Sequence, residues 1–252
     1  MDTKQLLIEY TLHLADNALI LGHRNSEWTG HGPVLEQDIA ISNIALDLIG
    51  QARNFYQYAA VLSGDGKTED DFAYHRDSTD FRNCLLVEQP NGDWAQTIIK
   101  QFFFSSYQYF FFSRLQQIND QTFAAIAAKS IKEVAYHVRW CSEWVIRLGD
   151  GTEESHNRIK TALENNWKFT GELLCPASYE KELSQLGMSV DLFDLQAAFE
   201  KKIEEVLSEA TLPIPVGKNM IYGGKNGEHS EHLGSLLTEM QFLQRANPGC
   251  EW

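Results

Sequence analysis

The hydrophobic residues of the chain recur at the spacing of amphipathic helices, and no stretch shows the strict alternation typical of a β-strand. Short stretches rich in glycine or proline, such as 64–66, 90–92 and 149–151, separate these segments and predict turns. The pattern predicts helices at about residues 3–24, 34–62, 93–118, 120–148, 153–174, 191–210 and 229–246.

Helices joined by short connections predict an all-α fold. No Ser- or Pro-rich linker and no internal repeat divides the chain, so we expect residues 1–252 to form a single helical domain. The four central helices have the length of a four-helix bundle, with additional N- and C-terminal helices around it. The interior of such a bundle can house a cofactor.

A metal site would need a specific set of inward-facing ligands. Di-iron bundles take one Glu from each of two helices and a Glu-x-x-His motif from each of the other two. The stretch IKEVAYHVRW, residues 131–140, places Glu133 and His137 on an apolar flank beside Trp140 and Trp144. Their spacing is i,i+4, whereas a di-iron bundle uses i,i+3.

The neighbouring helices offer too few further ligands. On the helix at 34–62, Asp38 and Asp47 lie at opposite edges of the apolar face. No acidic residue or histidine occurs between residues 93 and 120 of the next helix. On the helix at 153–174, Glu164 and Glu172 are expected to point away from the inward face. We therefore expect no metal site and no catalytic or cofactor-binding residues in this chain.

Two interpretations of Glu133 and His137 remain. They can form a buried pair that hydrogen-bonds internally, one helical turn apart. Alternatively, they belong to a degenerate metal site with Asp38 and Asp47 as its other candidate ligands. The first interpretation is favoured, because a working centre would need two or three more carboxylates than the helices supply.

Two other clusters have residue types that bind metals. Glu153 and His156 form the chain's one Glu-x-x-His motif, and a glycine-rich stretch brings His229, Glu231 and His232 to the start of the last helix. Both clusters occupy first turns of helices, where acidic residues complement the helix dipole and polar residues cap free N–H groups. We favour the helix-start interpretation for both.

The stretch FFFSSYQYFFF, residues 102–112, covers every side of its helix with aromatic residues. A helix that is apolar all round is central in its own domain or is pressed against a second protein. Core packing is the more common explanation, and any surplus would suit a partner interface.

Charge and cysteine content narrow the class of protein. A net charge of −14 disfavours nucleic acid and anionic lipid as partners. The most apolar stretch is too short for a membrane span of about 20 residues, and the N-terminus does not resemble a signal peptide. Four widely separated cysteines suggest neither a zinc ribbon nor a disulfide framework. A cytoplasmic location fits best.

Several longer segments, spread from about Gly30 to Arg245, resemble one protein family. The segments are GHGPVLEQDIAISNIALDLIGQARNFYQYAA, LLVEQPNGDWAQTI, AKSIKEVAYHVRW and HSEHLGSLLTEMQFLQR. Together they are similar to the non-catalytic, structural C subunits of bacterial phenylacetyl-CoA epoxidase, a multicomponent monooxygenase.

The resemblance implies a ferritin-like fold and a supporting role in aerobic phenylacetate breakdown. The implied partner is a homologous catalytic subunit that carries the di-iron centre and binds the acyl-CoA, while this chain has no cofactor of its own. A homodimer stays open. So do two other functions: a di-iron oxygenase with a non-standard ligand set, and a helical adaptor unrelated to oxygenase chemistry.

Overall fold

The computed structural model describes residues 2–216 and 219–250, and every regular element in these residues is helical. The elements are α1 (Thr3–Ser26), α2 (Leu35–Ser63), α3 (Glu69–Tyr74), η1 (Ser78–Asp80), α4 (Leu85–Glu88), α5 (Trp94–Leu115), α6 (Gln121–Gly149), α7 (Glu153–Asn166), η2 (Trp167–Phe169), α8 (Thr170–Leu174), α9 (Ser178–Gln185), α10 (Phe193–Glu209), η3 (Gly224–Asn226) and α11 (Glu231–Ala246). The all-α prediction is confirmed.

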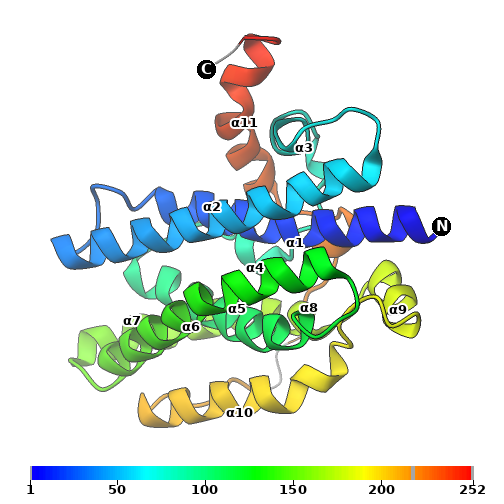
Figure 1. Ribbon diagram of the computed structural model, residues 1–252. Coiled ribbons are helices and arrows are strands. Elements are labelled where there is room, and N and C mark those ends of the chain that lie inside the picture. Colours follow the sequence, from blue (N-terminus) through cyan, green and yellow to red (C-terminus); the bar gives the residue numbers. More distant parts are fainter. Residues whose placement is uncertain (1, 217–218, 251–252) are drawn as a thin grey trace.

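The longest helices form two antiparallel pairs. Helix α2 runs back along α1, and α6 runs back along α5, as Figure 1 shows. The pairs pack on each other through α2 and α6, while α7 and α10 lie against the α5–α6 pair. One buried apolar cluster extends through both pairs, from Leu6 on α1 to Leu237 on α11.

The membership of this bundle differs from the sequence-based expectation. Helix α1 belongs to it, with buried residues from Leu6 to Asn25. The helix expected at 153–174 ends at Asn166, tightens into the 3₁₀ turn η2 and continues only as the short α8. The lengths of the predicted helices therefore did not show which of them form the bundle. The break at η2 was missed because the spacing of side chains in the sequence runs almost unbroken through a 3₁₀ turn.

Side-chain caps fix where three of the bundle helices, α1, α5 and α6, begin. Asp2 accepts a hydrogen bond from the Gln5 N–H at 2.7 Å, and Asp93 accepts one from the Gln96 N–H at 3.0 Å. Asp120 caps α6 in the same way. Such caps satisfy N–H groups that have no partner within the helix, which explains why the predicted helix starts agree with the structure within a residue.

The aromatic helix is a core helix. Six of the nine aromatic residues of α5 are buried, Trp94 and Phe110 are half-buried, and only Tyr109 is exposed, at 36%. The favoured interpretation, core packing, is therefore confirmed, and α5 leaves little apolar surface for a partner. Helices α6, α7 and α10 pack against α5, and side chains of α1 and α2 contact it as well, which the periodicity of α5 alone does not reveal.

Short helices between the long ones were not predicted. Helices α3, α4 and α9 span eight residues or fewer, too few to establish a helical period in the sequence. At the other end of the scale, none of the described helices combines the length and apolar character needed to cross a membrane.

Candidate functional site

Three of the four candidate residues, Asp47, Glu133 and His137, lie in a polar layer between α2, α5 and α6. His137 Nε2 is 3.0 Å from Asp47 Oδ2. Gln51 donates from Nε2 to Glu133 Oε2 at 3.1 Å, and its own Oε1 accepts from Gln108 Nε2 at 3.2 Å. We use the name polar layer for these five residues.

The polar layer corrects the interpretation of Glu133 and His137 as a mutual pair. Each has its partner on α2, although both belong to α6. His137 is fully buried, whereas Glu133 is half-buried and Asp47 retains 36% exposure of its side chain. Side chains one turn apart can meet, but here the facing helix offers an acceptor, Asp47, to His137 and a donor, Gln51, to Glu133.

The polar layer does not fit a di-iron centre. Four carboxylates and two histidines would have to converge, but the polar layer supplies two carboxylates and one histidine. The remaining members are the amides of Gln51 and Gln108, which are neutral and cannot offset the charge of two iron ions. Among residues 2–216 and 219–250, no group of three or more His, Cys, Asp or Glu side chains is arranged to hold a metal ion.

Asp38, the fourth candidate, lies apart from the polar layer. It is nine residues from Asp47 on the same helix, or roughly 14 Å along the axis at a rise of about 1.5 Å per residue. Its Oδ2 accepts a hydrogen bond from the Gly32 N–H at 3.0 Å, which closes the loop that precedes α2. Asp38 therefore has a local structural role.

The partner assignment in the polar layer predicts which residues are energetically coupled. Alanine substitutions at Asp47 and His137 should be non-additive by more than about 0.5 kcal/mol, because each removes the same hydrogen bond. Substitutions at Glu133 and His137 should add within about that amount, since their partners differ. Urea unfolding of the singles and both doubles measures the coupling. Strong coupling between Glu133 and His137 would restore the mutual-pair interpretation.

The two other predicted clusters occupy helix starts. His156 Nδ1 is 2.7 Å from the carbonyl oxygen of Gly149, and Glu153 lies exposed in the first turn of α7. Glu231 is exposed in the first turn of α11, and the carbonyl oxygen of His232 accepts from Arg24 at 3.2 Å. No metal geometry arises among the described residues of either cluster.

His229 has a role that the sequence did not predict. Its Nδ1 lies 2.7 Å from Glu88 Oε2, and its Nε2 lies 3.0 Å from the Phe81 carbonyl oxygen. Burial alone would lower the pKa of His229, but the hydrogen bond and charge of Glu88 outweigh it and raise that pKa above 6.5. The other oxygen of Glu88 accepts from the Ser230 N–H, so this pair fixes the start of α11.

A second buried network joins residues distant in the sequence. Glu180 Oε2 is 3.0 Å from Lys225 Nζ, and Glu180 Oε1 is 3.7 Å from His13 Nε2, all nearly or fully buried. Burial alone would raise the pKa of Glu180, but Lys225 and then His13 hold it below its usual value. The network ties α9 and η3 to α1. Its signal in the sequence was the polar content of the otherwise apolar α1.

The expectation that Glu172 points away from the interior is wrong. This side chain is only 2% exposed and accepts backbone N–H bonds from Leu85 at 2.6 Å and Gly223 at 2.9 Å. The break between α7 and α8 turns it inward, so helical periodicity extrapolated across the break gave the wrong direction. The part of the chain around Gly223 depends on this carboxylate for its backbone hydrogen bonds.

Asp16 on α1 is the centre of another buried cluster. Tyr56 donates to its Oδ1 at 2.6 Å, and the Arg82 N–H donates to its Oδ2 at 2.8 Å. The guanidinium of Arg76 pairs with both carboxylate oxygens, one at 3.1 Å. Asp16 is fully buried, so it joins α1, α2 and the segment at 76–82 without solvent screening.

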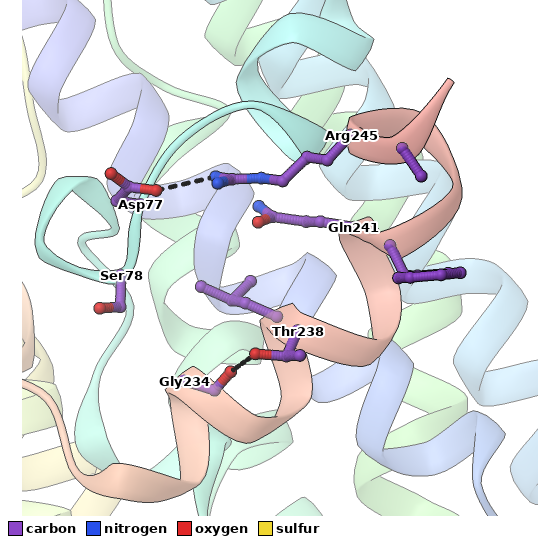
Figure 2. A pocket seen from close by; sticks show the side chains of 9 residues that line it. Asp77, Ser78, Gly234, Thr238, Gln241 and Arg245 are labelled. Atoms are coloured by element: carbon purple, nitrogen blue, oxygen red, sulfur yellow. Dashed lines mark hydrogen bonds and ion pairs between the residues drawn. The ribbon is translucent and has the colours of Figure 1, made fainter. Parts of the chain in front are cut away.

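A surface hollow of about 610 Å³ lies where α11 meets the turn at residues 77–78. Figure 2 shows Arg245 reaching across to Asp77, an ion pair of 2.9 Å. Gln241 donates to the carbonyl oxygens of Ala73 and Arg76 at 3.1 and 3.0 Å. The polar groups of the hollow thus hold α11 in place, and no acid, base and nucleophile converge among its described lining residues.

Comparison with known proteins matches the sequence of this chain to one family. The family model described as "Phenylacetic acid catabolic protein" matches residues 1–252. The chain is 48% identical over 246 residues to the C subunit of 1,2-phenylacetyl-CoA epoxidase from Escherichia coli (strain K12), covering 98% of this chain and 99% of that protein. The expected resemblance and the ferritin-like class are confirmed. This chain belongs to the family of phenylacetic acid catabolic proteins.

Proposed function

We propose that this chain is the non-catalytic structural subunit of a 1,2-phenylacetyl-CoA epoxidase in aerobic phenylacetate catabolism. It binds and supports a homologous catalytic subunit that carries the di-iron centre. The identity with the C subunit of such an epoxidase, over nearly the full length, supports the complex and pathway. We also propose that residues 1–252 act as one domain, which the continuous buried cluster supports.

The composition of the polar layer carries the proposal of a non-catalytic role. Its two carboxylates already pair with His137 and Gln51, and its remaining positions hold amides where a di-iron centre needs charged ligands. The four cysteines are all free, two of them exposed, which supports a reducing location such as the cytoplasm.

Metal analysis tests the proposal directly. The chain purified aerobically and incubated with ferrous iron should retain well under one iron per chain, because the polar layer lacks the ligands. Co-expression with the neighbouring genes should yield a complex whose iron belongs to the other subunit. Two irons in this chain, with an oxygen-sensitive optical band, would establish the oxygenase alternative built on Asp38, Asp47, Glu133 and His137. Failure to form any complex would favour an unrelated adaptor.

A further inference from the structure

One face of α2 is apolar although it faces solvent. Leu35, Ile39 and Leu46 are 71%, 51% and 66% exposed, and Val34, which precedes the helix, is 53% exposed. At 100° per residue, the three helical residues fall within about 40° of one another. We call these four residues the α2 stripe.

The α2 stripe does not contribute to the core packing of this chain. The buried face of α2, which includes Ile41, Ile44 and Leu48, packs against α1 and α6 and provides the core contacts. Figure 1 shows α2 at the outside of the bundle, with its N-terminal end projecting past α1. Single exposed leucines are ordinary on a protein surface, but several exposed apolar side chains along one side of a helix are a feature of interaction surfaces.

Two small residues, Ser42 and Gly50, lie along the same side of α2. Ser42, between Ile39 and Leu46, directs its hydroxyl to Thr29 at 2.9 Å. Farther along, a Cβ added at Gly50 would meet nothing within 4 Å. Asp47, the partly exposed partner of His137, follows Leu46 directly. A protein bound to the α2 stripe would therefore also cover the outer edge of the polar layer.

The charged residues around the α2 stripe indicate which kind of partner surface is complementary to it. Between Arg24 and Arg53 the sequence has no Lys or Arg, and the charged residues on the turns that form the α2 stripe are Glu36, Asp38 and Asp47. In a two-fold contact with a second copy, the α2 stripe would face itself and bring these acids against like charges. A partner with Lys or Arg around an apolar patch is complementary in both respects.

We propose that the α2 stripe is the docking surface for the catalytic subunit of the epoxidase, through an apolar patch bordered by basic side chains. This inference rests on the proposed function. Four side chains form only the centre of a stable interface, which commonly buries about 1,600 Å² in total. Within this interface, the residues of the α2 stripe are the apolar anchors that carry most of the binding energy. The acidic residues Glu36, Asp38 and Asp47 form its polar rim.

Substitution of Leu46 by lysine tests the proposal. The variant places a cation opposite a basic rim and a polar group in the apolar centre, so its affinity for the purified catalytic subunit should fall at least tenfold. Val61→Lys is the matched control, because Val61 is on the same helix and 77% exposed but lies 15 residues farther along. Its affinity should stay within about twofold of the unsubstituted chain. Glu36→Lys should weaken binding at low salt, and less so at roughly 0.5 M salt, where screening is strong.

The outcomes separate this inference from the proposed function. If the unsubstituted chain does not bind the catalytic subunit, the proposed function is overturned. If it binds and Leu46→Lys binds equally well, only the docking surface is overturned. Sedimentation of the isolated chain gives a further check: a dimer that Leu46→Lys dissociates would assign the α2 stripe to a second copy and overturn the proposal. All three substituted positions are exposed, and unchanged melting curves verify that the variants fold.

Discussion

Replacing Asp16 by alanine is expected to lower the free energy of unfolding by about 3–5 kcal/mol, the cost of removing one partner from a buried ion pair. Asp16 is fully buried, and the Arg76 side chain that pairs with it is only 12% exposed. Without the carboxylate, the guanidinium loses its counter-charge, and Tyr56 and the Arg82 N–H lose their acceptor. Such groups are costly to leave unpaired in the interior.

Thermal unfolding measures this effect. A loss of that size should lower the melting temperature by roughly 6–20 °C, at about 2–4 °C per kcal/mol for a chain of this size. Glu204→Ala, an exposed substitution within α10, is the control and should change stability by less than about 0.5 kcal/mol. If Asp16→Ala melted like the control, the Asp16 cluster would not be a structural centre of the fold.

Replacing His229 by glutamine is expected to cost about 2–3 kcal/mol at pH 6, because a buried imidazolium with charge-assisted bonds is lost. In the folded chain, burial acts to lower the pKa of His229. The hydrogen bond and charge of Glu88 outweigh burial and raise this pKa above 6.5. The folded chain therefore binds this proton more tightly than the unfolded chain. The resulting stabilisation is fully present below pH 6.5 and is lost as the pH rises through the folded-state pKa.

Urea unfolding of both proteins between pH 5.5 and about pH 9 tests this dependence. The stability difference between the unsubstituted chain and His229→Gln should be largest at the acidic end and should shrink as the pH rises. His31→Gln, at an exposed histidine, should change stability by less than about 0.5 kcal/mol throughout. A difference that grows with pH would mean that His229 is neutral when folded, and that Glu88 holds α11 through Ser230 alone.

The helices themselves could be predicted from the sequence because a helix is a local structure. The expected segments at 93–118 and 120–148 correspond to α5 and α6 within three residues at each end, and aspartate caps mark both starts. The buried face of α2, with Ile41, Ile44 and Leu48, also follows from its spacing. The shortage of carboxylates near Glu133 and His137 was visible for the same reason, since α5 contains none.

The tertiary structure decided which distant residues contact each other. His137 meets Asp47 across 90 residues of chain, and His229 meets Glu88 across 141, so neither partner could be read from spacing along one helix. The inward turn of Glu172 depends on a break between helices that local periodicity does not mark. By itself, the sequence determined the long helices, their apolar faces and the absence of carboxylates from α5, because these depend on neighbours within a few turns. The choice of bundle helices, the buried ion pairs and the exposed stripe on α2 depend on which distant surfaces remain open once the core has packed, and only the folded chain decides that.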